Sequence, residues 1–270
     1  MSLFWLRVAV GLYGVSMLYA LVALLRRREI ISRFTLPIAG VGLTLHFVAL
    51  VEAFRSGSMA RMPLHESESL LAFLMMLLFV MVYYFYRTTS PGIVVLPTAF
   101  LLTLSAALAQ SAPQFASPML RSGWIYTHIA LIFAGYAALF FSFIASILYL
   151  LHERSLKAKK ITGISAKLPA LETIDDLGYR LLLIGFPFMT FGLIAGSVIA
   201  QAEFGSKFFH DPKVLFSVLM WGVYMVMLYT RWSAGWRGRR AAVLSAFAFA
   251  AALSAWAANY ISGMHRFVSR

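Results

Sequence analysis

Cysteine is absent from this 270-residue chain. Without thiols, the chain itself can form no disulfide, no thiolate metal site and no iron–sulfur cluster, so another protein has to supply any thiol chemistry. Charge is also scarce, because only 12% of the residues are charged whereas 61% are hydrophobic. A soluble domain of this length needs more charge to keep its surface hydrated. The composition therefore excludes a soluble fold and indicates an integral membrane protein.

Unbroken apolar runs of about 18 residues or more distinguish this chain from a membrane β-barrel, whose segments are short and alternate in polarity. Hydrocarbon offers no partner to an unpaired backbone group, so such runs cross the membrane as helices. The sequence therefore predicts an all-α integral membrane protein of about eight transmembrane helices. The predicted spans cover residues 3–25, 34–54, 67–86, 92–110, 124–151, 179–202, 213–231 and 240–262.

No repeat, low-complexity tract or long linker divides the chain, which predicts a single polytopic membrane domain over residues 1–270 with a retained first helix. The longest polar stretch, 152–178, is predicted to be a loop, with a surface helix starting near Thr173. Three glycines of the sixth span, Gly185, Gly192 and Gly196, predict close packing against a neighbouring helix.

Lysine and arginine are distributed unevenly over alternate loops. One set of loops carries fifteen of them, at positions 26, 27, 28, 33, 87, 154, 157, 159, 160, 167, 180, 231, 237, 239 and 240. The opposite set carries seven, at positions 55, 61, 121, 207, 213, 266 and 270. The positive-inside rule then predicts that 152–178 is cytoplasmic and that both termini lie on the outer, periplasmic side. The net charge of +13 thus has its source in loops beside the lipid bilayer and does not indicate nucleic-acid binding.

Histidines are the main candidates for chemistry in a chain with few acids. An imidazole in or near hydrocarbon must satisfy both ring nitrogens, so a histidine within a span is a functional candidate. Neutral imidazole is also a standard axial ligand of heme iron, and two of them at one depth can hold a heme. Helix capping or pairing with a neighbour explains any single outer histidine equally well. Those on the outer side are His65, His128, His210 and His265, with His46 deeper and His152 cytoplasmic.

Outer segment 203–213 joins the sixth and seventh spans and carries aromatic residues suited to a porphyrin face and cations suited to propionates. Aromatic belts occur at most membrane interfaces, so this composition alone is weak evidence. In the outer loop between the second and third spans, Glu66 and Glu68 start the third span, where they suit either a helix cap or a functional site.

Four stretches together resemble a known family. They are residues 63–70 (PLHESESL), 124–128 (WIYTH), 211–213 (DPK) and 259–265 (NYISGMH). In this order they are similar to motifs of the cytochrome c assembly family, which includes CcsA-type heme-handling synthase subunits and HemX-like proteins. The family has a Pro-Leu-x-x-x-Glu-Ser element, a first external histidine, a tryptophan-rich outer loop ending in Asp-Pro-Lys, and a Gly-x-His ending with a second external histidine.

The resemblance implies a heme-binding role in cytochrome c biogenesis, with heme b held at the outer face for delivery or attachment to apocytochrome c. It implies His128 and His265 as axial ligands of the iron, and a bacterial inner membrane as the location. It further implies a subunit of a heme lyase or synthase, without a catalytic motif of its own, working with a CcsB-type membrane subunit. Weaker candidates for the heme environment are Trp124, Phe208, Phe209, His210 and Asp211, and His46 is an intramembrane candidate.

Two departures from the family pattern favour the HemX-like branch. Phenylalanine and histidine replace the tryptophans within 204–210, and Tyr229 stands where synthase subunits carry an intramembrane histidine. The alternative function is then regulation of heme biosynthesis through glutamyl-tRNA reductase, with the basic stretches 152–168 and 237–240 as docking surfaces. A transporter of heme or another small molecule is a third alternative, although no inverted repeat indicates one.

Overall fold

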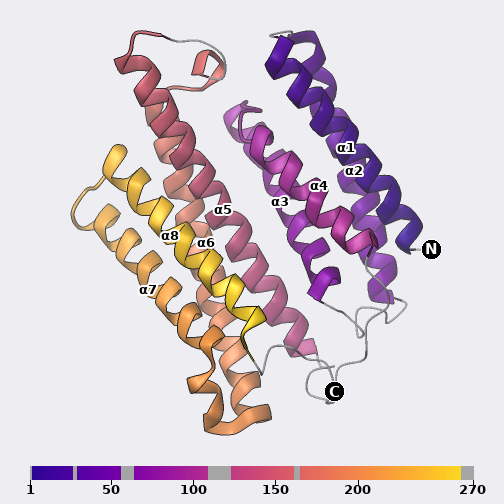
Figure 1. The fold of residues 1–270 in the computed structure, drawn as a ribbon, viewed down its shortest axis with the longest axis vertical. Helices are drawn as coiled ribbons and strands as arrows, with labels where there is room; N and C mark the ends of the chain where they lie inside the picture. The colour runs from indigo at the N-terminus through magenta and orange to yellow at the C-terminus, as the bar shows by residue number, and fades with distance from the viewer. Residues whose placement is uncertain (1, 27–28, 56–63, 109–122, 161–164, 263–270) are drawn as a thin grey trace. The chain divides into compact units, whose positions relative to one another are not determined.

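The computed structural model describes residues 2–26, 29–55, 64–108, 123–160 and 165–262. Within these ranges the chain forms eight α-helices and no strand (Figure 1), which confirms the predicted all-α membrane class. The helices are α1 (Ser2–Arg26), α2 (Glu29–Arg55), α3 (Leu64–Tyr86), α4 (Gly92–Leu108), α5 (Gly123–Lys157), α6 (Leu171–Phe204), α7 (Pro212–Trp232) and α8 (Arg239–Ala257). Three short 3-10 helices are η3 (Ser165–Lys167), η4 (Gly205–His210) and η5 (Ala258–Tyr260).

Seven of these eight helices are long and apolar enough to cross a membrane, and α4, with 17 residues, is shorter. Helices α5 and α6 have 35 and 34 residues, so each extends over about 50 Å, which exceeds a hydrocarbon core of about 30 Å. Both therefore continue into the stretch 152–178 that the sequence predicts as a loop. The residues that follow the apolar run of α5 include Glu, Arg, Leu and Lys, which are good helix formers, so the end of the apolar run does not end the helix.

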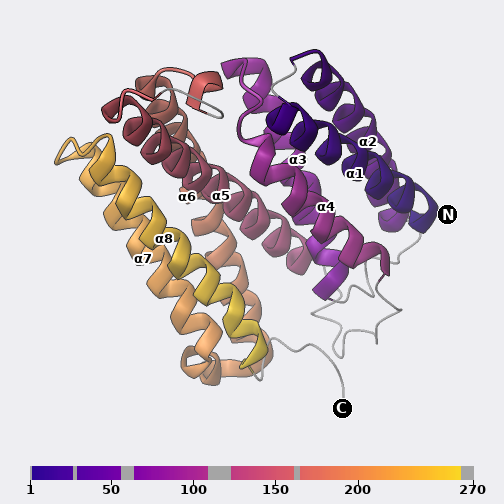
Figure 2. The same cartoon turned by 45° about the horizontal axis from the view of Figure 1, so that its top comes forward.

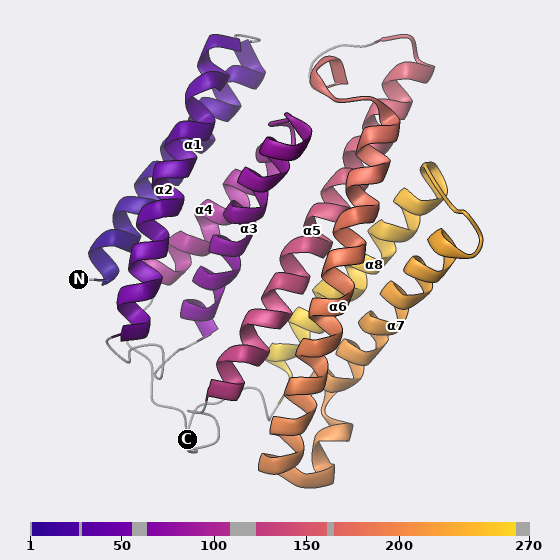
Figure 3. The ribbon, with the colours of Figure 1, turned by 180° about the vertical axis from the view of Figure 1, so that it is seen from behind.

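The chain is divided into two compact units. The N-terminal unit comprises residues 1–114 and 155–169, and the C-terminal unit comprises residues 115–154 and 170–270. In the N-terminal unit α1 packs along α2, and α4 packs against α1 and α3 (Figure 3). In the C-terminal unit α7 and α8 lie side by side as a hairpin (Figure 2). Its core consists of Leu139, Leu182, Met189, Met220, Tyr224 and Met227 with small residues of α8.

Glycines bring α5 and α6 of the C-terminal unit into close contact. A Cβ on Gly185 would lie 2.9 Å from Cβ of Ala138, and a Cβ on Gly192 would lie 2.8 Å from the Ile132 side chain. Both approaches are too short for a real side chain, so only glycine allows this separation. The predicted packing role of these two glycines is confirmed.

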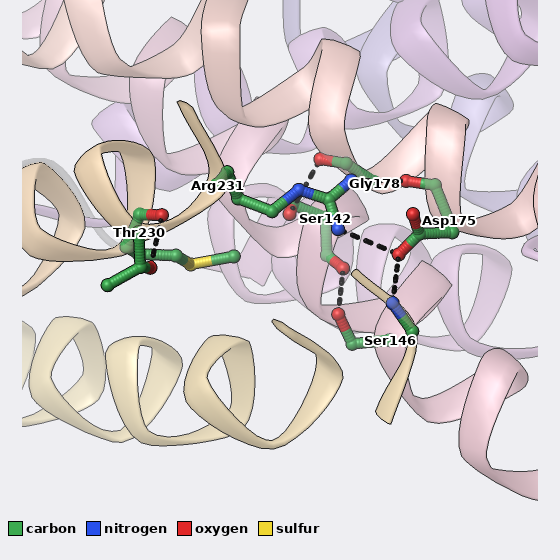
Figure 4. A network of polar contacts seen from close by, with 8 residues as sticks. Ser142, Ser146, Asp175, Gly178, Thr230 and Arg231 are labelled. Atoms are coloured by element: carbon green, nitrogen blue, oxygen red, sulfur yellow. Dashed lines mark hydrogen bonds and ion pairs between the residues drawn. The ribbon is translucent and has the colours of Figure 1, made fainter. Parts of the chain in front are cut away.

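A buried ion pair joins three helices at the end of the C-terminal unit that the charge distribution predicts to be cytoplasmic (Figure 4). The Arg231 guanidinium of α7 donates to Oδ1 of Asp175 in α6 at 2.7 Å and to its main-chain oxygen at 3.1 Å. The N–H of Gly238, which precedes α8, donates to the same Oδ1 at 3.1 Å. The guanidinium also lies 4.8 Å from the ring centroid of Tyr179. One carboxylate therefore connects α6, α7 and the start of α8.

Replacing this carboxylate should destabilise the protein. Asp175→Ala leaves the Arg231 guanidinium, whose side chain is 7% exposed, without its counter-ion, and we expect a loss of about 3 kcal/mol. The matched control is Asp176→Ala, because Asp176 pairs with Arg180 on the surface and such pairs contribute about 1 kcal/mol or less. Thermal unfolding in detergent measures both, and equal melting temperatures for the two variants would contradict the prediction.

Candidate functional site

His128 lies in the second turn of α5, at the end opposite the Asp175 ion pair. Its Nδ1 lies 2.7 Å from the main-chain oxygen of Gly192 in α6. A carbonyl oxygen can only accept, so Nδ1 carries the proton and, in the neutral ring, Nε2 carries the lone pair. Within the described part of the chain the ring has no second hydrogen-bond partner. The imidazole is thus oriented by the backbone and has one nitrogen available to a ligand.

The glycine face of α6 makes room for this ring. A Cβ built on Gly196 would lie 2.5 Å from Cε1 and 2.7 Å from Nδ1 of His128. Gly196 therefore has a more specific role than the predicted helix packing, because it accommodates an imidazole. Any larger residue at this position would displace the ring from the Gly192 carbonyl.

Asp211 starts α7 and connects it to the C-terminal segment. Its side chain is buried, Oδ1 accepts from the main-chain N–H of Lys213 at 2.9 Å, and Oδ2 accepts from the Ser262 hydroxyl at 2.6 Å. Pro212 occupies the first helical turn, where its missing N–H leaves no donor unpaired. The Asp-Pro-Lys sequence is therefore a helix cap, and the same carboxylate holds a segment 51 residues later in the chain.

Lys213 forms the second connection between the start of α7 and the C-terminal segment. Its ammonium group donates to Oδ1 of Asn259 in η5, and Nδ2 of Asn259 donates to the main-chain oxygen of Trp256 at 2.8 Å. His128 contacts α6 at Gly192 and Gly196, and Trp221 of α7 donates to Thr190 of α6 at 3.0 Å, so the start of α7 lies at the His128 end of the unit. Residues from α5, α6, α7 and η5 therefore meet at one end of the C-terminal unit.

The other predicted residues of this region differ in exposure. Phe208 is buried and Phe209 is 58% exposed, with their ring centroids 4.0 Å apart. His210 is exposed, and Trp124, in the first turn of α5, is 64% exposed. Phe209, His210 and Trp124 are thus accessible from outside the unit, whereas Phe208 belongs to its interior. His65 and His265 lie outside the described residues.

His46 belongs to the N-terminal unit, and its surroundings differ from those of His128. The buried ring has Nδ1 3.3 Å from the Tyr13 hydroxyl and Nε2 2.8 Å from the Ser69 hydroxyl. The ring of Phe73 packs edge-on against it, with the centroids 5.6 Å apart. Both nitrogens are engaged by protein groups, so in this conformation His46 joins α1, α2 and α3 and presents no lone pair to a ligand.

Three polar groups of the site are not among the site residues predicted from the sequence. They are the Gly192 carbonyl, the Asn259 amide and the Ser262 hydroxyl. The Asp-Pro pair does signal a helix start, but nothing local identifies a partner for its carboxylate far along the chain. A main-chain carbonyl has no sequence signature at all.

The Asp211 junction can be tested with a double-mutant cycle. Asp211→Ala removes both the helix cap and the Ser262 contact and should destabilise by about 2 kcal/mol, whereas Ser262→Ala removes the contact alone and should cost about 1 kcal/mol. We expect a coupling energy above about 0.5 kcal/mol between the two changes. Thermal unfolding in detergent supplies the values. Ser254→Ala serves as the control, because that exposed hydroxyl bonds only within its own helix, and additive effects at 211 and 262 would disprove the coupling.

Comparison with known proteins agrees with the resemblance seen in the motifs. Residues 38–264 match a family described as cytochrome C assembly protein. Three similar proteins carry the name cytochrome c biogenesis protein CcsA, each 30% identical. The one from Trieres chinensis aligns over 67% of this chain and 69% of its own length. For the one from Chlamydomonas reinhardtii these shares are 88% and 67%, and for the one from Prochlorococcus marinus they are 78% and 76%. The matched region contains every described residue of the site.

Proposed function

The chain belongs to the cytochrome c assembly protein family, and on that premise we propose that this multi-pass membrane protein acts in cytochrome c biogenesis by holding heme. The heme is bound at the outer end of the C-terminal unit and is passed or attached to an apocytochrome c. The ligand is cargo for this protein, and the proposed cargo is heme b, whose iron accepts neutral imidazole as an axial ligand.

The observation that carries this proposal is the orientation of His128. Histidines that bind metals usually donate their second N–H to a carbonyl or carboxylate, which fixes the tautomer and raises the basicity of the ligating nitrogen. Nδ1 of His128 does this at 2.7 Å with Gly192, and Nε2 remains for the iron. The His128 imidazole therefore fits the role of an axial ligand on one face of a heme. His265 is the proposed second ligand, on the strength of its place in the family motif.

The remaining residues of the site suit the same cargo. Phe209 and Trp124 offer exposed aromatic faces, 58% and 64% exposed, that can pack on a porphyrin. Heme supplies the vinyl groups to which thiols of an apocytochrome add, and this chain, which has no cysteine, supplies position. The chain contributes to the reaction by raising the effective concentration of heme beside the apocytochrome. A second membrane subunit of the CcsB type is the proposed partner.

The first test is the visible absorption spectrum of the detergent-purified protein. We expect a Soret band with low-spin bis-imidazole features that His128→Gly and His265→Gly each weaken, because each removes one axial ligand. Free imidazole should restore the band of His128→Gly, and His152→Gln, at the other end of α5, is the control and should leave it unchanged. Heme-free wild type that added heme cannot reconstitute would contradict the proposal and favour the regulatory alternative.

Gly196→Ala tests the orientation of the ring without removing it. The added Cβ would lie 2.5 Å from Cε1 of His128, so the imidazole has to leave the Gly192 carbonyl. Loss of such an orienting contact typically weakens metal binding about 10- to 100-fold, and we expect that reduction in heme affinity. Gly222→Ala in α7 is the control, because nothing lies within 4 Å of a Cβ there. Heme titration compares the two variants, and equal affinities would show that the ring is not positioned by Gly196.

A further inference from the structure

The ammonium group of Lys213 has fewer partners than it can take. Such a group carries three N–H donors, and among the described residues it meets a single hydrogen-bond acceptor, the neutral amide oxygen of Asn259. The side chain is half-buried at the start of α7, where water is less available than on an open surface. A lysine placed in this way favours an anion as its next partner.

The neighbouring carboxylate does not fill this role. Both oxygens of Asp211 already receive donors, Oδ1 from the Lys213 main chain and Oδ2 from the Ser262 hydroxyl. Asp211 therefore moderates the positive charge of Lys213 through its field while its hydrogen bonds serve the helix cap. Asn259, itself tied to the main chain at Trp256, holds the ammonium in place without neutralising it.

Lys213 also stands near the histidine proposed to bind iron. The two side chains come from the first turn of α7 and the second turn of α5, and both helices run antiparallel to α6, which contacts His128 at Gly192 and α7 at Thr190, so the two side chains lie at the same end of the unit. A ligand held through Nε2 of His128 thus has a cation at its periphery. The only anionic groups on heme are its propionates, and a lysine binds a carboxylate through a charge-assisted hydrogen bond.

We propose that Lys213 is the residue that binds a carboxylate of the cargo. A heme propionate accepts a hydrogen bond from this ammonium while His128 binds the iron. This inference rests on the proposed function. It predicts a fixed orientation of the porphyrin, in which one propionate points toward the start of α7 and the opposite edge of the porphyrin points away from it. Lys207, on η4 and exposed, has no such role and provides a matched control.

The test uses a porphyrin that has no iron, so that histidine ligation does not enter. Metal-free protoporphyrin IX and its dimethyl ester are titrated into the full-length protein in detergent, with binding to empty micelles subtracted. Wild type should bind the diacid about tenfold more tightly than the diester, as expected for one charge-assisted hydrogen bond. Lys213→Gln should lose this preference and leave diester binding unchanged, whereas Lys213→Arg and Lys207→Gln should keep it. An equal effect of Lys213→Gln on both porphyrins, or none on either, would overturn the inference.

A second measurement separates failure of this inference from failure of the proposed function. Heme titration of Lys213→Gln should give the wild-type Soret position at a higher heme concentration, because the axial ligands are intact and only the propionate contact is lost. If heme binding depends on His128 but the diacid and the diester bind equally well, the carboxylate contact is disproved and the proposed function still stands. Wild type that binds neither heme nor porphyrin would remove both. Size-exclusion profiles and melting temperatures equal to wild type confirm that the variants are folded.

Discussion

Hydrocarbon cannot form hydrogen bonds, and the partners that polar groups find within the protein decide which of them remain available to ligands. Many hydroxyls of the spanning helices bond to a carbonyl one turn earlier, as Thr98 does with Val94 and Thr190 with Phe186. His46 is engaged at both nitrogens. His128 is engaged at one nitrogen, and the partner there is a backbone carbonyl, which fixes the tautomer. The same rule that makes His46 a structural residue makes His128 the candidate ligand.

At the end of the C-terminal unit that carries His128, neighbouring residues have different roles. Asp211 has a structural role, because it caps α7 and accepts a hydrogen bond from Ser262. Lys213, two residues later, keeps donors for a ligand, and Phe209, two residues earlier, keeps an exposed face. The carboxylate and the lysine also secure the segment that leads to His265. Because Asp211 stabilises the start of α7 and its contact with the C-terminal segment, Lys213 and Phe209 are held in place and remain available to a ligand.

One of the two departures from the family pattern lies in the other half of this unit. Tyr229, which the resemblance places where synthase subunits carry an intramembrane histidine, is 64% exposed on α7 and turned away from the core around Tyr224 and Met227. Next to it, Arg231 is committed to Asp175. Neither residue offers a ligand to an iron within the unit, so the proposed function depends on the outer site. Phenylalanines in place of tryptophans keep the apolar faces of the outer loop and lose the indole N–H donors.

Local signals in the sequence were sufficient for the class of the protein and for several of its parts. Apolar runs longer than a bilayer is thick require helices, and each predicted span coincides with a helix, except that η5 follows α8 within the last span. Asp-Pro-Lys marks a helix start because the cap involves residues two apart. The end of α5 was missed, and the surface helix predicted to start near Thr173 is the first part of α6 itself, since hydropathy reports where lipid ends and not where the helix ends. Tertiary structure alone decided that Asp211 meets Ser262, that Lys213 meets Asn259 and that the Gly192 carbonyl orients His128. These contacts join segments 46 to 64 residues apart, and composition and periodicity carry no information about which distant polar groups the packing of helices brings together.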